Sequence, residues 1–81
     1  MSRTEIYEKL TTIFQDVFDD DDISLHDSTS AKDIEDWDSL THINLVLGVE
    51  QKFGIKFRTA EVAQLANVGE FVDLIGLKLS K

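Results

Sequence analysis

Apolar residues recur with a helical period through the first eighteen residues of the chain. They stand at positions i, i+4, i+7, i+8 and i+11, namely Ile6, Leu10, Ile13, Phe14 and Val17. Ser2 is followed three residues later by Glu5, which is the capping-box pattern of a helix start. The four aspartates Asp19 to Asp22 repel one another and oppose the dipole at a helix C-terminus. The pattern therefore predicts a first amphipathic helix that ends at about Phe18.

Residues 19–37 are polar and form a connection of unusual length for a compact domain. A loop this long is expected only where it is functional or is held against the rest of the fold. Apolar residues spaced along it can supply that attachment: Ile23, Leu25, Ile34 and Trp37. Residues 30–33 can form a short helical turn. We predict a loop that wraps the bundle and leads the chain to Asp38.

The most apolar helical segment follows, and it begins at a single serine. Asp38 is a good N-cap, because its carboxylate can accept a free N–H of the first turn and suits the positive helix end. Ser39 then lies in the first turn, and Gly54 provides a left-handed stop after Phe53. Apolar residues cover most of the circumference of this helix, which makes it central or partly covered by a partner.

The sequence pattern in the last third of the chain predicts two more helices. A short extended link is expected at residues 55–58, where apolar and basic residues alternate. Thr59 can cap a brief third helix that holds Val62 and Leu65. Asn67 with Glu70 repeats the capping pattern before a fourth amphipathic helix, whose apolar positions are Val68, Phe71, Val72, Ile75 and Leu79. The sum is an all-α fold over residues 1–81, a small four-helix bundle with a long first loop and a short third helix.

The amino-acid composition limits the classes of partner that this protein is expected to bind. The formal charge of −8 disfavours nucleic acid and anionic membrane surfaces and favours basic proteins. No segment has the length and apolarity of a membrane span, and the amino terminus lacks the order of a signal peptide. There is no Cys, which excludes disulfides and thiolate metal sites and fits a reducing cytoplasm. We expect a cytoplasmic monomer, and any sulfur chemistry must come from a prosthetic group.

Ser39 is the candidate for chemistry, and it admits three interpretations. As a nucleophile it needs a base, and His42 is the only nearby imidazole, without a glycine-rich oxyanion loop beside it. As an attachment point it needs only an exposed hydroxyl, a helix N-terminus that suits a phosphodiester, and a docking surface for the modifying enzyme. As a first-turn residue of an unmodified acidic adaptor, it needs no chemistry at all.

The whole chain resembles the acyl carrier proteins. The resemblance rests on the first amphipathic helix, the long acidic loop, the run Trp37-Asp38-Ser39-Leu40-Thr41, the apolar second helix ending Glu50-Gln51-Lys52-Phe53-Gly54-Ile55, and the two last helices. It implies that a phosphopantetheinyl transferase moves 4′-phosphopantetheine from coenzyme A to the oxygen of Ser39. The terminal thiol of that arm would then carry acyl groups as thioesters between other enzymes, and the protein itself would not be an enzyme.

The resemblance also implies a docking surface for acyl-loading and acyl-processing enzymes that carry basic residues. Its expected members are Asp38, Leu40, Ile43, Leu47, Glu50 and Glu61. Core or acyl-chain positions are expected at Leu45, Val46, Val49 and Phe53. For Leu40, Ile43 and Leu47, the alternative is an ordinary place in the core.

One departure from the family pattern bears on the pathway. Carrier proteins of fatty acid synthesis usually have several acidic residues along the second helix, whereas Thr41, Asn44, Gln51 and Lys52 stand on its polar side here. Ten of the sixteen acidic residues lie between Asp16 and Asp38 instead. This favours a dedicated pathway, such as polyketide, nonribosomal peptide or specialised lipid or sugar modification.

Other residues have plainer interpretations. The aspartate run lacks the spacing of a calcium-binding EF-hand loop, so a solvated acidic loop is expected. His26 and His42 lack metal-ligand spacing, and we assign them surface or packing roles. Trp37 is expected to anchor the loop. Gly48 is interpreted either as a tolerated surface glycine or as a place of close partner approach.

Overall fold

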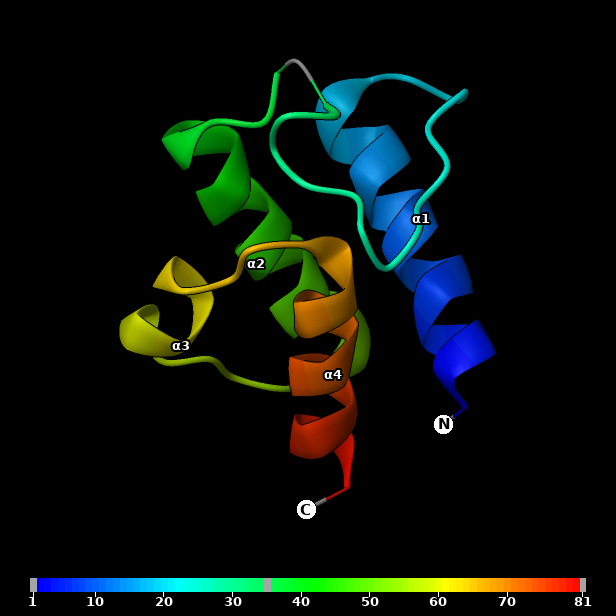
Figure 1. The fold of residues 1–81 in the computed structure, drawn as a ribbon. Coiled ribbons are helices and arrows are strands. Elements are labelled where there is room, and N and C mark those ends of the chain that lie inside the picture. Colours follow the sequence, from blue (N-terminus) through cyan, green and yellow to red (C-terminus); the bar gives the residue numbers. More distant parts are fainter. Residues whose placement is uncertain (1, 35, 81) are drawn as a thin grey trace.

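The computed structural model describes residues 2–34 and 36–80 and has four helices in that part of the chain. They are α1 (Arg3–Phe18), α2 (Ser39–Phe53), α3 (Thr59–Ala63) and α4 (Val68–Leu79). The start of α1 and the end of α4 lie toward one end of the molecule, and α2 begins toward the other (Figure 1). The short α3 lies beside α2, away from α1 (Figure 1). The predicted all-α fold with a long first loop and a short third helix is confirmed.

The core forms where α1, α2 and α4 meet. Its buried apolar members are Ile6, Leu10, Ile13, Phe14, Leu45, Val49, Val68, Phe71, Val72 and Ile75. Gly48 lies in the α1–α2 contact, because a Cβ there would stand 3.0 Å from Cγ2 of Ile13. The half-buried Gly48 therefore lets α1 and α2 approach closely and is more than a tolerated surface glycine, while close approach of a partner at Gly48 stays a prediction.

Both ends of α1 form as the sequence predicts. The Oγ of Ser2 accepts the N–H of Glu5, and the Glu5 carboxylate accepts the N–H of Ser2, both at 3.2 Å. The helix ends at Phe18, and Asp19 follows in the left-handed conformation with φ of 51°. Aspartate tolerates this conformation better than most residues, so the first aspartate of the run also terminates the helix.

The long loop is held against the core at all four predicted anchors, since Ile23, Leu25, Ile34 and Trp37 are half-buried there. The turn at residues 30–33 is also confirmed, with the Asp33 N–H donating to the Ser30 carbonyl at 2.9 Å. The loop has a further role that the sequence did not reveal. Its carbonyls at Thr29 and Asp27 accept the N–H groups of Val68 and Gly69 at 2.7 and 2.9 Å. The loop thus satisfies free donors at the start of α4.

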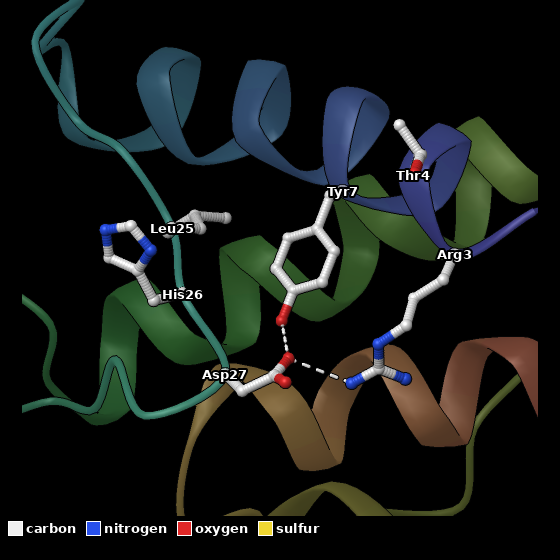
Figure 2. A pocket seen from close by; sticks show the side chains of 6 residues that line it. All are labelled: Arg3, Thr4, Tyr7, Leu25, His26 and Asp27. Carbon is white, nitrogen blue, oxygen red and sulfur yellow. Dashed lines mark hydrogen bonds and ion pairs between the residues drawn. The ribbon is translucent and has the colours of Figure 1, made fainter.

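A polar cluster joins the loop to α1 and α4. The Tyr7 hydroxyl donates to a carboxylate oxygen of Asp27, and the Arg3 guanidinium donates to the same oxygen at 2.9 Å (Figure 2). Arg3 also pairs with Asp73 of α4 at 2.6 Å. These bonds hold the pKa of Asp27 below its usual value, the Tyr7 hydroxyl contributing most. Burial, then the bond to Asp27, raises the pKa of Tyr7 to about 12.

Two details of the last helices differ from the prediction. Arg58, not Thr59, occupies the N-cap position of α3, and no side chain caps the helix there. Instead the Glu61 carboxylate accepts the N–H of Arg58 at 2.8 Å, because a free N–H can be satisfied from inside the first turn as well as from the cap. The helix ends at Ala63, so Leu65 packs against the core from the following turn. The cap of α4 is confirmed, with Asn67 accepting the N–H of Glu70 at 2.9 Å.

Candidate functional site

Ser39 is the first residue of α2, and its side chain is exposed. The predicted cap precedes it: Oδ1 of Asp38 accepts the N–H of Thr41 at 3.0 Å, and Oγ1 of Thr41 accepts the N–H of Asp38 at 2.8 Å. The backbone N–H of Thr41 is the main cause of the lowered pKa of Asp38. The reciprocal bonds fix the first turn of α2, and with it the position from which the Ser39 hydroxyl projects.

A groove of about 520 Å³ lies beside Ser39, between α2 and α3. Its floor and walls are largely apolar. The lining residues include Trp37, Ile43, Val62, Leu65 and Ala66. A group attached to Ser39 therefore has an apolar surface within reach.

The His42 side chain, one turn into α2, has both of its ring nitrogens hydrogen-bonded within the fold. Its Nδ1 accepts the indole N–H of Trp37 at 3.1 Å, and its Nε2 lies 3.0 Å from the carbonyl of Val62. Since Nδ1 acts as an acceptor, Nε2 carries the hydrogen and donates to that carbonyl. Neither ring nitrogen is free to take a proton from Ser39, so the imidazole cannot serve as its base. The geometry excludes the serine hydrolase and confirms the packing role of His42.

The loop anchor Trp37 is also confirmed. Its ring meets Phe14 of α1 edge-on, with centroids 5.2 Å apart and planes at 87°. On its other side it stacks against His42 at 6.0 Å. The last part of the loop is therefore fixed to both α1 and α2 immediately before Ser39.

Three large apolar side chains of α2 face solvent. The exposed fractions are 70% for Leu40, 56% for Ile43 and 50% for Leu47. Their alternative placement in the core was wrong. The other apolar positions of the helix are inside as expected, with Leu45 and Val49 buried and Val46 and Phe53 half-buried against the core.

The two glutamates predicted to meet partners are engaged within the fold. The Glu50 carboxylate accepts the N–H of Phe57 at 2.8 Å, which ties the end of α2 to the link that follows it. The Glu61 carboxylate pairs with Lys78 of α4 at 2.9 Å, in addition to its bond with the Arg58 N–H. The Arg58 N–H and then Lys78 lower the pKa of Glu61. The structure thus gives both carboxylates a structural partner that sequence spacing could not reveal.

Comparison with known proteins decides the family. Residues 8–75 match the family described as "Phosphopantetheine attachment site". The chain belongs to the phosphopantetheine-dependent acyl carrier proteins. It is 31% identical over 78 residues to an acyl carrier protein of Thermotoga maritima, covering 96% of each chain. Over 75 residues it is 33% identical to one of Acidothermus cellulolyticus, covering 93% of this chain and 89% of the other.

A solved structure supports the same family. The solution structure of a holo acyl carrier protein from Geobacter metallireducens superposes with a TM-score of 0.87 at 48% identity, over 93% of this chain and 86% of the other. Membership implies a 4′-phosphopantetheine prosthetic group and a carrier role that is not enzymatic. It also implies interaction with a phosphopantetheinyl transferase and with acyl-processing enzymes. The exposed Ser39 hydroxyl and the groove beside it fit such a group.

Two further observations concern metals and membranes. Residues 2–34 and 36–80 contain no group of three or more His, Cys, Asp or Glu side chains placed to hold a metal ion. The aspartate run at 19–22 is exposed, in keeping with a solvated loop. No helix in the same ranges combines the length and the apolar character needed to cross a membrane.

Proposed function

We propose that Ser39 carries the 4′-phosphopantetheine arm, and that the thiol of the arm holds acyl intermediates as thioesters. The observation that carries this proposal is the placement of an exposed hydroxyl at the first residue of a capped helix, directly beside an apolar groove. The helix N-terminus favours the negative charge of a phosphodiester. The absence of Cys leaves the arm with the only thiol of the loaded protein.

The alternative is an unmodified acidic adaptor that binds basic proteins through α2. It shares the exposed helix face, but it has no need of the Ser39 hydroxyl. The family match at residues 8–75 supports the carrier, since the family is defined by phosphopantetheine attachment.

Intact-protein mass separates the two functions. The protein is incubated with coenzyme A and a phosphopantetheinyl transferase of broad specificity, and its mass is compared before and after. The expected result is a gain of one phosphopantetheine in the wild type and none in Ser39→Ala. Ser24→Ala, which removes an exposed hydroxyl from the loop, serves as the matched control and should gain the same mass as the wild type. A folded wild-type protein that gains no mass would leave the adaptor as the better account.

We further infer that the carrier serves a dedicated pathway rather than general fatty acid synthesis. Support comes from α2, whose exposed side chains before its last turn are uncharged. The holo-protein should therefore be a poor acceptor for the malonyl transferase of fatty acid synthesis, compared with a carrier from that pathway. Equal rates of malonyl loading would contradict this inference. The monomeric state and the cytoplasmic location stay predictions.

A further inference from the structure

Two side chains that are bonded to each other stand between the groove beside Ser39 and the hydrophobic core. Trp37 and His42 both line the groove, and the indole N–H of Trp37 donates to Nδ1 of His42 at 3.1 Å. Their rings are stacked, with planes at 23° and centroids 6.0 Å apart. Both side chains are half-buried. Each therefore faces the groove with part of its surface and packs inward with the rest.

Behind this pair lies a fully buried part of the core. The ring of Trp37 meets Phe14 edge-on at 5.2 Å, and the ring of His42 lies 6.4 Å from that of Phe71. Phe14 and Phe71 have no exposed surface. A series of ring contacts thus leads from the groove to α1 on one side and to α4 on the other. An alkyl chain that entered here would have to displace close-packed rings.

His42 also joins α2 to α3 across the groove. Its Nε2 donates to the carbonyl of Val62 at 3.0 Å, and Val62 lines the groove from the α3 side. Separating the two helices to admit an alkyl chain would break this bond. The imidazole N–H and the carbonyl would then lie unpaired beside apolar surface, which is unfavourable. Two purely apolar side chains in these positions would separate without that cost.

Resting on the proposed attachment at Ser39, we propose that Trp37 and His42 form a barrier that keeps the acyl cargo out of the core and thereby limits the cargo to short acyl groups. The groove of about 520 Å³ stays open to the arm. A long alkyl chain held outside the barrier leaves methylenes in water, at a cost that rises with their exposed area. A short acyl group has few methylenes to cover, so it is carried without this cost.

The test compares the melting temperatures of two loaded forms. A phosphopantetheinyl transferase of broad specificity loads the protein from acetyl-coenzyme A or from decanoyl-coenzyme A, and intact-protein mass confirms each product. In the wild type the two forms should melt within about 2 °C of each other, because the longer chain gains no burial. A decanoyl chain buried in the core would raise the melting temperature by more than about 10 °C, since each buried methylene stabilises the fold.

Replacing His42 by Val removes the ring and both hydrogen bonds, and should open the barrier. The decanoyl form of His42→Val should melt at least about 5 °C above the acetyl form of the same variant. Comparing two forms of one variant cancels the loss of stability that the substitution itself causes. His26→Val, the same change at an exposed histidine of the loop, is the matched control and should behave like the wild type.

The fluorescence of Trp37, the single tryptophan, gives a second readout that needs no variant. Its emission should be the same in the acetyl and decanoyl forms of the wild type, because neither chain passes the indole. Emission that shifts with chain length would overturn the barrier. So would a chain-length effect on melting that is equal in the wild type and His42→Val. Those results would still show loading at Ser39, whereas a folded wild type that gains no mass would overturn the attachment proposal itself.

Discussion

The indole N–H of Trp37 donates to Nδ1 of His42 at 3.1 Å, and this bond determines which ring nitrogen of the imidazole carries the hydrogen. With Nδ1 as acceptor, Nε2 must carry the hydrogen that bonds the Val62 carbonyl. The His42 side chain therefore links the loop, α2 and α3. Because α3 has only five residues, its position depends on contacts of this kind rather than on its own helical stability.

Replacing His42 by Phe should destabilise the fold. The ring still fills the space, but the Trp37 N–H and the Val62 carbonyl lose their partners, at a cost of about 1–3 kcal/mol. Urea denaturation followed by the fluorescence of Trp37, the single tryptophan of the chain, measures the loss. His26→Ala, a change at the exposed histidine, should remain within about 0.5 kcal/mol of the wild type. An equally small effect for His42→Phe would show that the two bonds contribute nothing.

Gly69 and Gly76 of α4 should respond to alanine in opposite directions. A Cβ at Gly69 would stand 2.9 Å from the backbone oxygen of Asp27, so the loop must move, at about 1–3 kcal/mol. A Cβ at Gly76 would meet only Cδ1 of Ile6 at 3.8 Å, an ordinary contact. Alanine there should gain up to about 1 kcal/mol from helix propensity. Thermal melting of both variants tests this, and a stabilised Gly69→Ala would contradict the close approach of loop and helix.

The polar cluster around Tyr7 predicts a loss of stability in alkali. The pKa of Tyr7 is raised from 10.0 to about 12, chiefly by burial and then by the hydrogen bond to Asp27. Because the pKa of Tyr7 is higher in the folded protein than in the unfolded chain, its contribution to the stability of the fold is complete below pH 10. That contribution is lost as the pH rises through about 12. Tyr7 is the single tyrosine, so tyrosinate absorbance reports it alone.

The midpoint of the Tyr7 titration, followed by tyrosinate absorbance, should lie at a higher pH in the native protein than in denaturant. Asp27→Asn should lower the native midpoint, because it removes the carboxylate that disfavours tyrosinate. Identical midpoints in the native and denatured protein would show that neither burial nor Asp27 acts on the Tyr7 hydroxyl.

Glu50 should contribute to the stability of the fold, through its hydrogen bond with the Phe57 N–H. Glu50→Ala removes the acceptor of the Phe57 N–H and should cost about 1 kcal/mol, whereas Glu50→Gln keeps an oxygen that can accept. Hydrogen exchange at the Phe57 amide gives the local readout, since opening of this link exposes that N–H. Exchange should accelerate in the alanine variant and stay slow in the glutamine variant. Equal protection in both would remove the carboxylate from this role.

The helices themselves could be predicted because their causes are local. The apolar period of α1 and α4 and the caps at Ser2, Asp38 and Asn67 depend on residues three or four positions apart, within reach of one helical turn. The same local logic placed Ser39 at the start of α2. It failed at Thr59, where Glu61 satisfies the free N–H of Arg58 from inside the helix.

The sequence by itself thus determined four helices, a loop attached at spaced apolar residues, and a serine at the start of the most apolar helix. Tertiary structure alone decided which polar groups pair and which apolar groups stay outside. Arg3 meets Asp73 across 70 residues and His42 meets Val62 across 20, distances at which spacing carries no information about contact. Leu40, Ile43 and Leu47 share the apolar character of the core but face solvent, because the core forms on the other side of α2, where α1 and α4 pack.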